Sequence, residues 1–224
     1  MKVELIPVLE IFNSNENIKL PDLGPSWKYK DEWETYHYLC NKADGFSENL
    51  KSYTKGSWLY KVDEISDEDL LLLIYKEIET QQTEENNGIE DLACSFSGGY
   101  VLRLDDVDVY FPQCCGCLAD IKEWEGLISG KTRSFYPGHP FPRVTENENK
   151  IRFDFIDIEI RESFAPPVPV NIVEIEKIDL KLAIAEANKI LQIFADQLIK
   201  INEKENLSIS NIDRRLIWAD EEFD

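Results

Sequence analysis

The segment 98–127 constrains the fold of this chain more than any other stretch. Side chains alternate in character over 100–105 and again over 107–111, which is the period-two pattern of strands with two unlike faces. The two aspartates between these runs favour a tight turn, because aspartate tolerates the left-handed backbone region and hydrogen-bonds to nearby backbone. We therefore predict a β-hairpin that ends at Pro112, which has no N–H for a ladder.

A cysteine-rich turn and a short helix follow this hairpin. The run 113–117 reads Gln-Cys-Cys-Gly-Cys and is compact enough for a turn, in which Gly116 can take a positive φ. Asp120 is the predicted N-cap of the helix, with Glu123 three residues on as in a capping box. Gly130 fits the C-terminal end of that helix.

The rest of the chain mixes helical and strand patterns without strict alternation. This favours an α+β fold with a mainly antiparallel sheet of hairpins and about four helices, including a long C-terminal helix. We treat 1–224 as a single domain, with a possible boundary near 163–171 where prolines stiffen the chain. The other predicted helices cover 30–42, 67–80 and 180–203, and the other predicted strands cover 2–12, 56–62, 143–146, 151–155 and 172–178.

Two of these helices carry more detailed predictions. In the helix over 30–42, helical spacing places Trp33, Tyr36, Leu39 and Cys40 on one buried stripe. Asp179 is the predicted N-cap of the C-terminal helix.

Charge is concentrated in one part of the chain. The net charge is −20, and the segment 63–91 holds 11 acidic residues and one basic residue. Such a surface repels nucleic acid and anionic membranes and attracts a basic protein partner, although a solvated face that only confers solubility is the simpler alternative. The residues predicted to meet a basic partner are Asp67, Glu68, Glu84, Glu85, Glu90 and Asp91.

Cysteine usage and the N-terminus predict the cellular location. Five cysteines cannot all pair within one chain, which favours a compartment that keeps thiols reduced. The first residues lack the pattern of a secretory signal, and no apolar run approaches the roughly 20 residues that span a bilayer. We expect a cytoplasmic protein.

The cysteine-rich turn is a candidate metal site. Zinc takes four ligands, and Cys114, Cys115 and Cys117 are combined here with Cys94 or His139 as the fourth. A zinc motif normally pairs two cysteine knuckles, and this chain has one cluster. The favoured interpretation is therefore that the cysteines are small buried residues in a tight turn.

The same turn is a candidate for thiol chemistry. Cys117 precedes a predicted helix N-terminus, which favours a thiolate. His139 would be its base, and Asp120 or Asp106 would orient the imidazole. The alternative for His139 is a hydrogen bond to backbone, and His37 is predicted to be structural. No catalytic, cofactor-binding or metal-ligating residue is assigned, and no cofactor is expected, because none of the motifs HExxH, GxGxxG and Walker A is present.

Part of the chain resembles a known group of proteins. The motifs that carry the resemblance are Gly98-Gly99-Tyr100, Pro112-Gln113-Cys114-Cys115-Gly116, Asp120, Trp124-Glu125 and Gly138-His139-Pro140. Together they resemble uncharacterised bacterial proteins, some of which look like immunity proteins of polymorphic toxin systems. That family has an acidic residue directly after its Cys-Cys-Gly turn, where this chain has Cys117.

The resemblance and the charge lead to the same functional hypothesis. They predict a non-enzymatic, acidic bacterial protein that binds a basic toxin or nuclease and neutralises it, as an immunity-type inhibitor does. The resemblance transfers no catalytic residue. The alternative hypothesis is a zinc- or thiol-dependent enzyme centred on the turn Cys114–Cys117.

Overall fold

The chain forms two compact units, and each is built from two stretches of the sequence. This computed structural model describes residues 1–81, 95–130, 135–158 and 162–219. Unit 1 comprises Met1–Pro7 and Ser97–Gln192, and unit 2 comprises Val8–Phe96 and Ile193–Asp224. Antiparallel sheets and a long C-terminal helix confirm the predicted α+β class. The single-domain organisation stays a prediction.

The predicted hairpin is present in unit 1. Strand β3 (Gly98–Leu104) pairs antiparallel with β4 (Val107–Tyr110), and on its other side it neighbours the first part of β1 (Val3–Glu10). Asp105 and Asp106 form the turn with positive φ angles of 45° and 66°. Two successive residues in that region are typical of tight hairpin turns, because the turn's twist then matches that of the strands.

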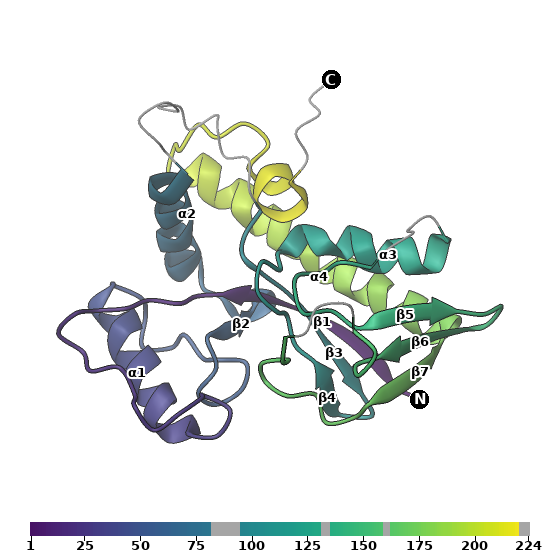
Figure 1. Ribbon diagram of the computed structural model, residues 1–224. Helices are drawn as coiled ribbons and strands as arrows, with labels where there is room; N and C mark the ends of the chain where they lie inside the picture. The colour runs from purple at the N-terminus through teal and green to yellow at the C-terminus, as the bar shows by residue number, and fades with distance from the viewer. Residues whose placement is uncertain (82–94, 131–134, 159–161, 220–224) are drawn as a thin grey trace. The chain divides into compact units, whose positions relative to one another are not determined.

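A second antiparallel sheet in unit 1 has the order β5-β6-β7, and Figure 1 shows the three strands side by side. Its strands are β5 (Arg143–Glu146), β6 (Lys150–Asp154) and β7 (Ile172–Glu176). Ile151, Phe153 and Phe155, which alternate along the predicted strand 151–155, are all buried. Phe153 packs in an aromatic cluster with Trp124, whose ring centroid lies 5.9 Å away.

A short 3-10 turn (η3, Leu118–Asp120) leads into helix α3 (Ile121–Ser129). Asp120 occupies the predicted N-cap position of α3, but its side chain makes no capping hydrogen bond to that helix. Its carboxylate accepts the backbone N–H of Cys117 at 2.8 Å, because the helical path starts three residues before α3 and is capped there. Gly130 ends α3 in the left-handed conformation, as predicted.

Unit 2 contains α1 (Lys30–Ala43), β2 (Leu59–Lys61) and α2 (Asp67–Gln81). The last residues of β1 pair antiparallel with β2. Trp33, Tyr36 and Cys40 fit the predicted buried stripe of α1. The prediction for Leu39 is wrong, because 43% of its surface is exposed. The buried face is turned toward His37 and Asn41, because the amide of Asn41 donates a hydrogen bond to Tyr60 of β2 at 2.8 Å.

Helix α4 (Lys177–Lys204) runs from unit 1 into unit 2. Asp179 lies within its first turn, so the predicted N-cap role of this residue is wrong. The helix starts earlier because β7 ends at Glu176 and the chain turns directly into the helix, where the N–H of Lys177 donates to the carbonyl of Asn149 at 2.7 Å. Short helical turns complete unit 2 at η1 (Val62–Glu64) and η4 (Arg214–Trp218).

Candidate functional site

The cysteine-rich turn and a proline-flanked loop meet in unit 1. Cys114 and His139 form an isolated antiparallel bridge, in which the N–H of His139 donates to the carbonyl of Cys114 at 3.0 Å. The N–H of Gly98 donates to the carbonyl of Gly116 at 3.0 Å, which ties the turn to the start of β3. A backbone hydrogen bond therefore joins the turn to the loop, although Cys114 and His139 are 25 residues apart in sequence.

Two glycines make this close approach possible. A Cβ on Gly138 would lie 2.7 Å from the carbonyl oxygen of Cys114, and one on Gly116 would lie 2.7 Å from that of Gly98. Gly138 also has a φ of +91°, which L side chains rarely adopt. A side chain at Gly138 would push the loop away from the turn, and one at Gly116 would push the turn away from the start of β3.

We expect Gly138→Ala to lower the free energy of unfolding by about 3 kcal/mol, because it combines backbone strain with a clash against backbone atoms. The matched control is Gly130→Ala. Gly130 also has a positive φ, but a Cβ there meets nothing within 4 Å. The control should cost about 1 kcal/mol, and urea unfolding of both variants measures the difference. Equal losses would show that the close packing around Gly138 adds nothing.

Three soft or borderline ligand atoms gather at the surface of this site. Sγ of Cys114 lies 3.4 Å from Sγ of Cys115, which in turn lies 3.7 Å from Nε2 of His139. One ligand atom from each of the three residues lies within 4.8 Å of the others. Both thiols are exposed, so the favoured interpretation of buried packing cysteines is wrong for this pair. Exposure leaves the cluster open to ions and small molecules.

Glu162 contacts His139 on the side of the ring that faces away from the two cysteines. Its Oε2 lies 2.9 Å from Nδ1 of the imidazole, on the side of the ring opposite Cys115. The hydrogen bond that Glu162 accepts, and secondarily the contact with Cys115, raise the pKa of His139 above its ordinary value. Sequence reasoning missed Glu162. It follows His139 by 23 residues, beyond the β5–β6 hairpin, and no local pattern marks it.

Cys117 lies outside the cluster. Its Sγ is 3.7 Å from Oδ1 of Asp120, and burial raises the pKa of that carboxyl group to about 6. The predicted arrangement of Cys117 with His139 as base and Asp120 as orienting acid is therefore wrong, because His139 contacts Cys115. Asp106 lies in the β3–β4 turn, where its carboxylate pairs with Lys2. Cys94, the other predicted fourth ligand, lies outside the described residues.

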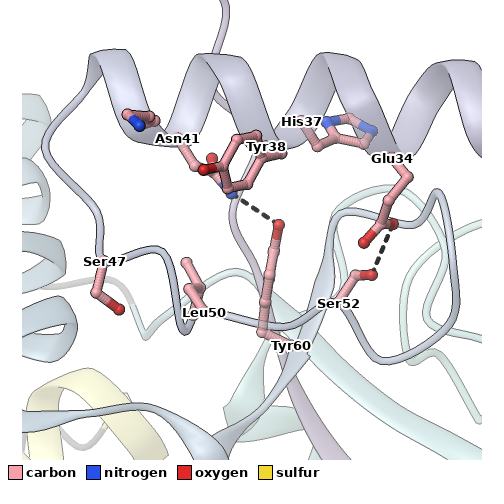
Figure 2. Close-up of a pocket in the computed structure, with 9 residues that line it drawn as sticks. Glu34, His37, Tyr38, Asn41, Ser47, Leu50, Ser52 and Tyr60 are labelled. Atoms are coloured by element: carbon pink, nitrogen blue, oxygen red, sulfur yellow. Dashed lines mark hydrogen bonds between the residues drawn. The ribbon is translucent and has the colours of Figure 1, made fainter.

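Unit 2 contains a second candidate, a small polar pocket beside α1 (Figure 2). Figure 2 shows the hydrogen bond that the amide of Asn41 donates to the hydroxyl of Tyr60. It also shows the one that the hydroxyl of Ser52 donates to the carboxylate of Glu34. The cavity measures about 30 Å³. Because one water molecule needs about 10–15 Å³, the pocket has room for about two waters and none for a substrate of ordinary size.

His37 lines this pocket and is buried, which agrees with its predicted structural role. Its ring packs among aromatic rings, with centroids 5.4 Å from Trp33 and 5.9 Å from Trp58. Neither ring nitrogen has a hydrogen-bond partner among the described residues. Burial lowers the pKa of His37 to about 4, so the imidazole is neutral at physiological pH.

Only two of the six acidic residues predicted to meet a basic partner lie among the described residues. Asp67 and Glu68 are exposed at the start of α2, where Asp67 accepts a hydrogen bond from Gln197 at 2.8 Å. Glu84, Glu85, Glu90 and Asp91 lie outside the described residues. The predicted acidic binding surface therefore stays a prediction.

Comparisons with known proteins add no assignment to this geometry. No family model matches the chain, and neither a search of the curated proteins nor one of the solved structures finds a match. Among the described helices, none combines the length and the apolar character needed to cross a membrane. The chemistry of the cluster is therefore the basis for a functional proposal.

Proposed function

We propose that this protein binds a zinc ion through Cys114, Cys115 and His139. The observation that carries the proposal is the spacing of the three ligand atoms. In a tetrahedral site with Zn–S bonds of about 2.3 Å, neighbouring ligand atoms stand about 3.5–3.8 Å apart. The distances of 3.4 Å between the two sulfurs and 3.7 Å from sulfur to Nε2 are close to that geometry.

Glu162 supports the proposal through the tautomer of His139. A carboxylate at Nδ1 favours the proton on that nitrogen and leaves the lone pair of Nε2 toward the two thiols. Histidines that bind zinc commonly donate their other N–H to a carboxylate, which also makes the imidazole a stronger ligand. In the proposed site, Glu162 would orient the zinc-binding imidazole of His139 without contacting the ion itself.

Three protein ligands leave one tetrahedral position for a water molecule or a group from a bound molecule. Structural zinc sites normally close all four positions with protein side chains, whereas open sites can exchange a ligand. The exposure of both thiols fits an accessible ion. We therefore propose that the bound zinc ion keeps one open, surface-accessible coordination position.

The test is a zinc titration of reduced, chelator-treated protein against a chromophoric chelator, with cobalt as a spectroscopic substitute. We expect one ion per chain and the sulfur-to-cobalt charge-transfer bands of a two-thiolate site. Cys114→Ser, Cys115→Ser and His139→Gln should each weaken binding by about 100-fold or more, and Glu162→Gln by about 10- to 100-fold.

Cys117→Ser is the matched control for the thiol variants, because its sulfur faces Asp120. It should leave zinc affinity and the cobalt spectrum unchanged. Substoichiometric binding in the wild type, or equal loss of affinity in Cys117→Ser and Cys115→Ser, would refute the proposed ligand set.

Binding of a basic protein partner, as by an immunity-type inhibitor, stays a prediction alongside this proposal. The net charge of −20 supports it, and so does the concentration of acidic residues over 63–91. Electrostatic attraction of this kind weakens as salt is added.

A further inference from the structure

The polar pocket beside α1 has several of its hydrogen-bond donors already engaged within the protein (Figure 2). The hydroxyl of Ser47 donates to a carboxylate at 2.7 Å, and the hydroxyl of Ser52 donates to Glu34 at 2.9 Å. Lys42 also belongs to the lining, and its ammonium group pairs with Glu48 at 2.5 Å. A ligand that brings its own donors is therefore better suited to this pocket than one that needs them.

Oxygen atoms with spare lone pairs also line the pocket. The hydrogen bonds that Glu34 accepts from Ser52 and from the N–H of Gly56, at 2.9 and 2.6 Å, both go to Oε2. Figure 2 shows the other carboxylate oxygen of Glu34 turned toward the side where the hydroxyl of Tyr60 lies. That hydroxyl accepts one hydrogen bond, from Asn41, and keeps a second lone pair. Burial, and secondarily the nearby charge of Glu34, raise the pKa of Tyr60 to about 12.

His37 adds a buried polar group that lacks a partner. Its side chain lines the pocket and is 2% exposed, and neither ring nitrogen has a hydrogen-bond partner among the described residues. A neutral imidazole has one nitrogen with a lone pair that can accept a hydrogen bond. Because a buried polar atom without a hydrogen bond is costly, a ligand that donates to this nitrogen removes part of that cost.

We propose that this pocket binds a primary ammonium group, supplied by a small amine or by a lysine side chain. The positive charge complements the carboxylate of Glu34, and the N–H donors match the hydroxyl oxygen of Tyr60 and a ring nitrogen of His37. The cavity of about 30 Å³ admits a group of two heavy atoms, such as methylammonium. A longer alkyl chain has to extend outside it. This inference goes beyond zinc binding, because the pocket lies in unit 2 and the proposed zinc ligands lie in unit 1.

The test uses the ring nitrogens of the two histidines in the chain, followed by ¹H–¹⁵N NMR of the full-length protein in EDTA at neutral pH. Methylammonium chloride replaces sodium chloride at constant ionic strength. We expect the His37 signals to shift and saturate, because one ring nitrogen gains a hydrogen bond, and those of His139 to stay unchanged. A ligand with two heavy atoms binds with a Kd of about 10 mM at best.

Two variants test the residues that contact the ammonium group. Glu34→Gln removes the charge and should weaken binding by about tenfold or more, whereas Glu32→Gln is the matched control on an exposed carboxylate outside the lining and should change nothing. Because Glu34 also holds Gly56, His37→Phe serves as a second variant that keeps the aromatic packing. It should lose binding while it stays folded, as read from the side-chain amide signals of Asn41.

A short peptide with blocked ends and one lysine distinguishes the two sources of the ammonium group. Binding of this peptide, but not of its Nε-acetylated form, supports a lysine side chain of a protein partner. Binding of methylammonium but of neither peptide supports a small free amine. Equal shifts with potassium chloride or methanol would mean that the pocket takes any small solute, and they would overturn the inference. Unmoved His37 signals, or equal affinities of Glu34→Gln and Glu32→Gln, would also overturn it.

Discussion

Replacing Asp69 with alanine will lower the free energy of unfolding by about 4 kcal/mol. Asp69 is 2% exposed, and its carboxylate accepts hydrogen bonds from the N–H and the hydroxyl of Ser47, both at 2.7 Å. It also accepts the hydroxyl of Ser66 at 2.9 Å, and Ser66 caps the N–H of Asp69 in return. Alanine leaves these donors without their acceptor and removes a negative charge from the first turn of α2.

The matched control is Glu68→Ala, one position earlier in the same helical turn. Glu68 is exposed, so its loss removes only a surface interaction with the helix dipole, at about 0.5 kcal/mol. Urea unfolding followed by circular dichroism measures both variants. Similar losses would mean that the buried hydrogen bonds of Asp69 contribute little to unit 2.

Acidification will destabilise the protein through His37, by about 3 kcal/mol between pH 6.5 and pH 4. Burial holds the pKa of His37 near 4 in the folded state, against 6.5 ordinarily. In this window the unfolded chain binds a proton at His37 and the folded chain does not. The free energy of unfolding therefore falls as pH decreases below 6.5, and this contribution levels off below pH 4.

The variant that isolates this effect is His37→Phe, which keeps an aromatic ring among Trp33 and Trp58 and removes two unpartnered nitrogens. Its stability at pH 7 should equal or exceed that of the wild type, and the difference between the two should widen by about 3 kcal/mol at pH 4. His139→Gln is the control, because the raised pKa of His139 gives that exposed residue the opposite sign. A constant difference between wild type and His37→Phe across this range would contradict the burial argument.

Local patterns predicted the elements of the fold better than their ends. The alternation around Asp105 and Asp106 was sufficient to find the β3–β4 hairpin, because both strand faces and the turn are encoded within a few residues. The capping predictions for Asp120 and Asp179 were inaccurate for a different reason. Asp179 lies inside α4, and the side chain of Asp120 caps the preceding 3-10 turn and not α3. A cap depends on where the preceding segment ends, and the 3-10 turn before α3 and the β7–α4 junction are set by backbone hydrogen bonds to other segments.

The site was predictable only in part. Its position at the Cys-Cys-Gly turn and the use of His139 followed from the few soft ligands in the chain. The choice of Cys115 over Cys117 depends on the bridge between Cys114 and His139, and Glu162 reaches His139 from beyond the β5–β6 hairpin. Contacts of this range arise from the folded arrangement of strands, which a single sequence does not display.

The division of the chain into two discontinuous units limits which fragments can contain a whole unit. The backbone passes from one unit to the other within β1, after Phe96 and within α4, so both units are discontinuous in sequence. A fragment cut before Ser97 keeps the cluster of Cys114, Cys115 and His139 but loses Met1–Pro7, which supply part of β1, the neighbour of β3 in its sheet. A chain that ends at Phe96 lacks the part of α4 and the η4 turn that belong to unit 2. Each unit must be rebuilt by joining its two segments through a new linker.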